Sequence, residues 1–233
     1  MKWIECLADL IFPRKCEICG RLLTGDERYI CEDCLEDMPL TYYWDWPENP
    51  AEKKLWVRTY LHRVIPLFFY TRESQYITLI HKIKYRGKIG LGLYMGRLLG
   101  EKIKRALPDV DYIVPVPLHP LRKWHRGYNQ AEIIAQGVAE VLFGRDEAVK
   151  HLLPHALRRK KYTRTQTRRK MDQKWSNVSN VFKARTPDLL IGKHILLIDD
   201  VLTTGSTAEA AYTALTKVCK DCKISFATLG YVE

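Results

Sequence analysis

The densest group of residues that could do chemistry lies at positions 195–207, which read Ile-Leu-Leu-Ile-Asp-Asp-Val-Leu-Thr-Thr-Gly-Ser-Thr. The uninterrupted apolar run at its start is typical of a strand buried on both faces of a parallel sheet. Asp199 and Asp200 follow directly, where open α/β sheets bind ligands. A small, hydroxyl-rich loop comes next, made of Thr203, Thr204, Gly205, Ser206 and Thr207. We expect a helix at 208–218 after it.

This order of groups predicts a phosphosugar site. Backbone N–H groups of the loop and the dipole of the following helix favour a bound phosphate. The two carboxylates lie one step earlier, so they can accept hydrogen bonds from sugar hydroxyls joined to that phosphate. A ribose 5-phosphate fits the arrangement. The alternative is a plain turn capped by Ser206 or Thr207, with the two acids in solvent.

The segment closely resembles the phosphoribosyl pyrophosphate (PRPP) motif of type I phosphoribosyltransferases. The rest of the chain is similar to the ComF family of competence proteins. The resemblance implies an α/β fold, with a type I phosphoribosyltransferase-like parallel sheet flanked by helices. It also implies that Asp199 and Asp200 bind the ribose hydroxyls, that the loop binds the 5-phosphate, and that Mg²⁺ accompanies PRPP.

Four cysteines near the N-terminus form two Cys-x-x-Cys pairs with eleven residues between them: Cys16, Cys19, Cys31 and Cys34. Four thiolates at this spacing predict a structural, tetrahedral Zn²⁺ site in a small zinc-ribbon module. The alternative is four unrelated buried cysteines. Cys219 and Cys222 form a lone Cys-x-x-Cys, for which we expect a structural role.

Composition limits the class of protein. The 233 residues are 46% hydrophobic and 28% charged, as in ordinary globular proteins. No apolar run approaches the roughly 20 residues of a membrane helix, and no secretion signal is recognisable, so we expect a cytoplasmic protein. The net charge of +11 favours anionic partners. Residues 1–12 have helical apolar spacing and predict a helix packed on the body, with peripheral attachment to the inner face of the membrane as the alternative.

The apolar patterns predict strands at 64–70, 111–117 and 223–231, and helices at 75–85, 91–107 and 131–142. Residues 40–66 are rich in aromatics and prolines and predict an irregular linker. We therefore expect a zinc module with its linker at 1–60 and a phosphoribosyltransferase-like domain at 61–233. Gly90, Gly92 and Gly96 miss the spacing of a dinucleotide fingerprint.

Several ionisable side chains follow the strand at 111–117, which indicates an anion site. In the resemblance this turn stands where phosphoribosyltransferases bind pyrophosphate, and the candidates are Leu118, His119, Arg122, Lys123 and Arg126. Residues 126–130, Arg-Gly-Tyr-Asn-Gln, are close to a ComF signature. Asn129 could instead be the N-cap of its helix. The basic run at 82–88 also resembles the ComF pattern, with a solvated helix end as the alternative.

The most basic stretch lies at 151–180, where dense like charges predict a mobile loop. In the resemblance it stands where a flexible loop closes over PRPP. Its candidate contacts are Lys160, Lys161, Arg164, Gln166, Arg168 and Arg169. Arg169 stands where the family has leucine and Lys174 where it has arginine. A solvated basic loop is the alternative.

Three functions compete. The first is a PRPP-binding competence protein that handles single-stranded DNA in the cytosol, with the DNA-uptake machinery as a partner. The second is an active phosphoribosyltransferase, although the sequence shows neither an acceptor pocket nor a general base, so enzymatic activity is left open. The third is a zinc-ribbon scaffold with a vestigial ligand pocket.

Overall fold

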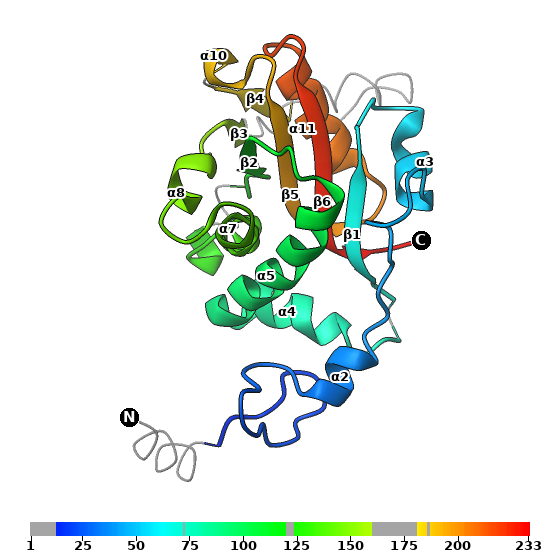
Figure 1. Cartoon of the computed structure of the whole chain (residues 1–233), viewed down its shortest axis with the longest axis vertical. Helices are drawn as coiled ribbons and strands as arrows, with labels where there is room; N and C mark the ends of the chain where they lie inside the picture. Colours follow the sequence, from blue (N-terminus) through cyan, green and yellow to red (C-terminus); the bar gives the residue numbers. More distant parts are fainter. Residues whose placement is uncertain (1–12, 72, 120–123, 160–180, 186) are drawn as a thin grey trace, which may run out of the picture.

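The computed structural model describes residues 13–71, 73–119, 124–159, 181–185 and 187–233 (Figure 1). These residues form a parallel sheet with the strand order β1-β6-β5-β2. Its strands are β1 (Val64–Phe69), β2 (Tyr112–Pro115), β5 (His194–Leu202) and β6 (Lys223–Tyr231). Because the strands are parallel, the chain leaves all four at the same edge of the sheet.

Helices cover both faces of the sheet. On one face lie α4 (Ile77–Tyr85), α5 (Ile89–Ala106) and α7 (Gln130–Phe143), and on the other lie α3 (Pro50–Trp56) and α11 (Ser206–Thr216). Leu196 and Ile198 of β5 pack in the first layer, whereas Ile195 and Leu197 pack in the second, and all four are fully buried. The uninterrupted apolar run is therefore the central strand that the sequence predicts, and the expected α/β fold is confirmed.

Two of the glycines that resemble a dinucleotide fingerprint serve close packing. A Cβ atom on Gly96 of α5 would lie 2.3 Å from the Ile134 carbonyl oxygen of α7, so the two helices meet at their backbones. A Cβ atom on Gly90 would overlap sterically with the hydroxyl oxygen of Tyr29, a residue of the N-terminal module. Gly96 therefore requires glycine because of the α7 backbone, whereas a side chain at Gly90 would force the Tyr29 side chain to move.

The N-terminal module lies beyond α4 and α5 at the far end of the molecule from α10 and contains α2 (Glu32–Glu36) (Figure 1). It is joined to α4 by the hydroxyl of Tyr76, which donates to the carbonyl oxygen of Cys34 at 2.9 Å. The rings of Tyr29 and Tyr94 meet at 5.5 Å between centroids. The module is therefore packed against α4 and α5.

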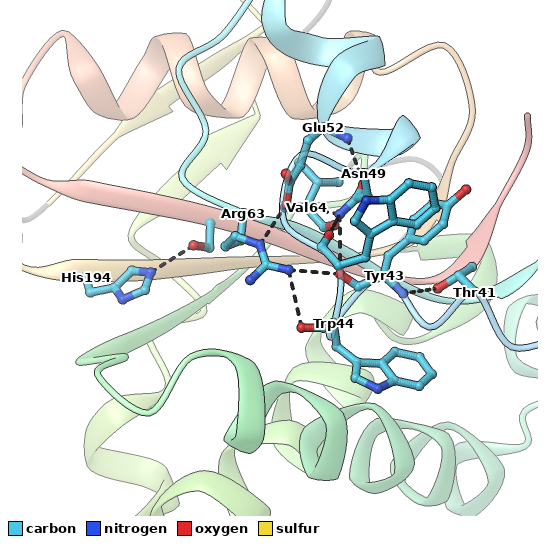
Figure 2. Close-up of polar contacts among 10 residues, drawn as sticks. Thr41, Tyr43, Trp44, Asn49, Glu52, Arg63, Val64 and His194 are labelled. Carbon is cyan, nitrogen blue, oxygen red and sulfur yellow. Dashed lines mark hydrogen bonds and ion pairs between the residues drawn. The ribbon is translucent and has the colours of Figure 1, made fainter.

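The predicted irregular linker is wrong in part, because it contains α3. Asn49 caps this helix by accepting from the backbone N–H of Glu52 at 3.0 Å, and Pro50 occupies its first turn. Glu52 also forms a buried ion pair with Arg63 at 2.8 Å, and Arg63 donates to the carbonyl oxygen of Tyr43 (Figure 2). This polar cluster fastens the linker to the start of β1.

Further short elements were not predicted from the sequence: α8 (Ala148–His151), β3 (Leu157–Arg159), β4 (Phe182–Ala184) and α10 (Pro187–Leu190). Strands β3 and β4 pair antiparallel. The segment between them holds the basic loop, whose residues 160–180 lie outside the described part of the chain, as do residues 1–12. Within the described ranges, no helix combines the length and apolar character needed to cross a membrane.

Candidate phosphosugar site and candidate metal centre

The acid pair lies within the last residues of β5, which runs to Leu202 and so extends past the expected strand end. Asp200 is buried, and its two oxygens have separate partners. One oxygen lies 3.0 Å from the Lys84 ammonium, and the other accepts from the Gln130 amide at 2.7 Å. Asp199 keeps some exposure and accepts from the backbone N–H of Asp200 at 2.9 Å. Lys84 is therefore the counter-ion of Asp200.

The two carboxylates differ in their electrostatics. Burial raises the pKa of Asp199 far above its ordinary value, and the neighbouring Asp200 charge acts in the same direction. Lys84 and Arg159 oppose this shift. The ionised form of Asp199 is therefore disfavoured relative to that of a free carboxyl.

The loop after β5 leaves the N-terminus of α11 open. Gly205 is the N-cap in a left-handed conformation with φ +80°, and no side chain caps the helix. The hydroxyls of Thr204 and Ser206 lie 3.0 Å apart, and the Thr204 carbonyl oxygen accepts from Arg58 at 3.1 Å. The side chains of Thr203, Thr204, Ser206 and Thr207 are exposed. The alternative of a turn capped by Ser206 or Thr207 is thus not what forms. The Ser206 N–H reaches the Thr204 hydroxyl at 3.5 Å, and a helix N-terminus whose N-cap residue supplies no side-chain cap is a place where an anion can bind.

The Arg-Gly-Tyr-Asn-Gln signature fixes the start of α7 against the acid pair. Arg126 donates to the Gln130 side-chain oxygen at 2.8 Å, and the amide nitrogen of Gln130 reaches Asp200. Asn129 is the N-cap, accepting from the Ala131 N–H at 3.2 Å, and it also donates to the Val116 carbonyl oxygen at 3.1 Å. Sequence reasoning named Asn129 and Arg126 but gave Gln130 no role, although the signature contains it.

Only some of the pyrophosphate candidates lie among the described residues. Leu118 and His119 are half-buried just past β2, and Leu118 borders a pocket of about 420 Å³ that Trp124 and Arg158 also line. Arg126 belongs to the network above. Arg122 and Lys123 lie outside the described residues, as do the flexible-loop candidates Lys160, Lys161, Arg164, Gln166, Arg168 and Arg169. Their roles stay predictions.

The basic run at 82–88 is not a solvated helix end. Lys82 and Lys88 both bind the Glu17 carboxylate, at 2.9 Å each, and Lys84 binds Asp200. Glu17 lies between the first two cysteines, so α4 touches the cysteine module on one side and the acid pair on the other. Lys84 could not be assigned this role from the sequence, because its partner Asp200 is distant in the chain.

The four N-terminal cysteines form one cluster, with all sulfur atoms within 4.8 Å of one another. Burial acts to raise the pKa of Cys16, but backbone N–H groups, led by that of Cys31 at 3.4 Å, outweigh it and lower the pKa to about 6. Four convergent sulfurs with a thiolate stabilised among them fit tetrahedral Zn²⁺. Cys16, Cys19, Cys31 and Cys34 would hold the metal, whose role there is structural.

The second Cys-x-x-Cys has a different environment. Cys219 is buried, and the Cys222 thiol donates to its carbonyl oxygen at 3.3 Å. Burial raises the pKa of Cys219 to about 11, which disfavours the thiolate needed for redox or metal chemistry. Among the described residues the N-terminal group is the one cluster with metal-ligand geometry. The environment of Cys219 and Cys222 therefore fits a structural role in packing.

A serine, a histidine and an aspartate meet at the opposite edge of the sheet. The His194 ring accepts or donates a hydrogen bond at 2.8 Å to Ser225 and lies 3.1 Å from an Asp109 oxygen. Ser225 is completely buried between strands, so its hydroxyl cannot reach a substrate. Burial also lowers the pKa of His194. This cluster joins the starts of β5 and β6 and is not a hydrolytic site.

Comparison with known proteins identifies the N-terminal module and several relatives. Residues 7–43 match the family model of a double zinc ribbon domain. DNA utilization protein YhgH of Escherichia coli K12 is 28% identical over 206 residues, covering 86% of this chain and 83% of the relative. Competence protein F of Haemophilus influenzae is 30% identical over 148 residues, covering 60% and 61%. Competence protein ComFC of Bacillus subtilis is 26% identical over 161 residues, covering 69% and 61%.

The chain is a homologue of the ComF competence proteins. The resemblance to the ComF family and the predicted N-terminal zinc-ribbon module are thereby confirmed. The double zinc ribbon match and the sulfur cluster together support structural Zn²⁺.

Proposed function

We propose that the protein binds PRPP or a closely related phosphosugar with Mg²⁺, and that it serves natural competence in the handling of single-stranded DNA. The observation that carries the proposal is the acid pair in β5 followed directly by the open N-terminus of α11. Two carboxylates and a helix N-terminus without a side-chain cap thereby follow one another in the order that a ribose 5-phosphate requires.

In this proposal each part of the site has one task. The N–H groups and hydroxyls at 203–207 bind the 5-phosphate, where the helix dipole adds to their attraction. Asp199 and Asp200 accept hydrogen bonds from the ribose hydroxyls. Mg²⁺, when bound with the ligand, offsets the charge of its pyrophosphate. Lys84 must leave Asp200 for the ribose to bind, so its ion pair is part of the binding cost.

The competence role rests on the relatives, two of which are named competence proteins and one a DNA utilization protein. The net charge of +11 supports a polyanionic partner. The basic stretch at 151–180 and the zinc module are the proposed DNA contacts, the DNA-uptake machinery is the proposed partner, and the cytoplasm is the proposed location.

An active phosphoribosyltransferase is the second candidate. The pocket of about 420 Å³ beside Leu118 supports it, because it offers space for an acceptor and one of its lining residues, Arg159, interacts electrostatically with Asp199. No residue in that pocket is assigned as a base. Release of pyrophosphate from PRPP with a panel of bases and amines tests this candidate; a wild-type rate equal to that of buffer alone would reject it.

The proposal is tested by two measurements on one purified sample. PRPP with Mg²⁺ should raise the melting temperature more than ribose 5-phosphate or pyrophosphate does alone, because only PRPP fills all parts of the site. Single-stranded oligonucleotides should bind with an affinity that falls steeply with salt, since each phosphate contact releases counterions. Equal melting shifts would reject the PRPP site, and salt-insensitive or absent DNA binding would reject the DNA role.

A further inference from the structure

A second pocket lies beside the acid pair, between the end of α4 and the turn that precedes α7. It has a volume of about 430 Å³ and is lined by Lys84, Tyr85, Gly87, His125, Arg126 and Tyr128. Lys84 is shared between this pocket and Asp200, so the pocket and the acid pair are separated by a single ion pair. Arg126 is also a pyrophosphate candidate, but none of the tasks given above to the acid pair or the phosphate loop uses this space.

The pocket holds a cation whose charge is not neutralised by a carboxylate of the described residues. Arg126 donates to the neutral side-chain oxygen of Gln130 at 2.8 Å, and no ion pair joins it to an acid within the described ranges. The Lys84 charge, in contrast, is matched by Asp200. An anion entering the pocket therefore meets the free charge of Arg126 beside the His125 ring.

The same pocket presents exposed aromatic surface. The Tyr85 ring is 68% exposed and lies 4.7 Å from the Arg126 guanidinium in a cation–π contact. The Tyr128 hydroxyl is held by the Ile83 carbonyl oxygen, which fixes that ring in the pocket wall. Trp124, which lines the separate pocket beside Leu118, is 79% exposed and packs edge-on against His125. Exposed rings next to an arginine form the kind of surface on which nucleic-acid bases stack.

We propose that this pocket binds one nucleotide of single-stranded DNA, with the base stacked on the Tyr85–Arg126 pair and a phosphate near His125. The inference rests on the proposed handling of DNA for its ligand, but it does not require PRPP binding. It adds the position at which the strand is held, directly beside the phosphosugar site. A phosphate there also competes with Asp200 for Lys84, which would free the carboxylate for the ribose.

The test is the affinity of the full-length protein for a labelled short oligothymidylate, measured by fluorescence anisotropy at fixed salt. Tyr85→Leu removes the aromatic face but keeps an apolar side chain, and we expect it to weaken binding by about 5- to 150-fold, the loss of one stacked base. Tyr85→Phe should bind as wild type. Tyr60→Leu is the matched control, because Tyr60 is 90% exposed and lies before β1 at the other edge of the sheet. Melting temperatures establish that the variants are folded.

A second experiment tests the contribution of the bases with an oligonucleotide that lacks them. An abasic oligonucleotide of the same length should bind wild type about as weakly as the oligothymidylate binds Tyr85→Leu, and inorganic pyrophosphate should compete poorly. Equal binding of both oligonucleotides, or a Tyr85→Leu variant with wild-type affinity, would overturn the nucleotide pocket while leaving the proposed DNA role intact. Absence of DNA binding by the wild type would overturn both.

Discussion

Replacing Gly205 by alanine should distort the phosphate loop, and the structure gives the size of the effect. Gly205 has φ +80°, a left-handed conformation that costs an L-residue about 1–2 kcal/mol. The added Cβ would lie only 2.2 Å from a methyl carbon of Leu55, which is fully buried in α3, so the Leu55 side chain, the loop or the helix must shift. Overpacking of this kind costs about 1–3 kcal/mol. The sum is a destabilisation of about 2–5 kcal/mol.

Urea unfolding, followed by circular dichroism, measures this destabilisation directly. Gly192→Ala is the matched control, since Gly192 also has a positive φ of 66° but has no neighbouring atom within 4 Å of its added Cβ. The control should lose only the backbone part, about 1–2 kcal/mol. The difference between the two variants then isolates the contact with Leu55.

The same substitution bears on function, because the loop at 203–207 is proposed to hold the 5-phosphate. Gly205→Ala should weaken PRPP binding, whereas Gly192→Ala should leave it unchanged. If Gly205→Ala has the same urea midpoint as the wild type, the left-handed conformation of Gly205 and its contact with Leu55 are contradicted. The geometry described for the phosphate loop would then be contradicted as well.

Three further predictions test other parts of the molecule. Cys16→Ser should reduce bound zinc in elemental analysis and lower the melting temperature, whereas one zinc per chain in this variant would remove the site. Glu52→Gln leaves the charge of Arg63 uncompensated in a buried setting and should cost roughly 3 kcal/mol in urea unfolding; an unchanged midpoint would contradict the burial of this pair. The pKa of Asp199 is raised in the folded state by burial and by Asp200, so the folded chain keeps a proton that the unfolded chain loses. Stability should therefore fall as pH rises from the ordinary aspartate range through the raised folded pKa, and Asp199→Asn should flatten that part of the profile.

Elements whose residues carry their own signal could be predicted from the sequence. Strand β5 could be predicted from its own apolar run, because a strand buried on both faces has no alternation of polar and apolar residues. Strand β6 was predicted at the residues where it occurs. The cysteine cluster was predicted by spacing alone, since two Cys-x-x-Cys pairs imply one tetrahedral centre.

Elements defined by distant partners could not be predicted in this way. Strands β3 and β4 have three residues each, too few for a pattern, and exist because they pair with each other. Helix α3 did carry a local signal, the N-cap Asn49 followed by Pro50, but the surrounding aromatic and proline-rich composition obscured it. The contacts of Asp200 with Lys84 and Gln130 join three separate elements, so only the folded chain brings them together.

The account depends most on the acid pair, and one calorimetric titration tests it directly. Wild type titrated with PRPP and Mg²⁺ should give a saturable heat of binding. Asp200→Asn should weaken that binding about 10- to 100-fold, because it removes charge-assisted hydrogen bonds to the ribose worth roughly 1.5–3 kcal/mol. Asp188→Asn, at an exposed acid of α10, is the control and should bind as wild type. No heat from the wild type, or an Asp200→Asn variant of unchanged affinity, would contradict the proposed site.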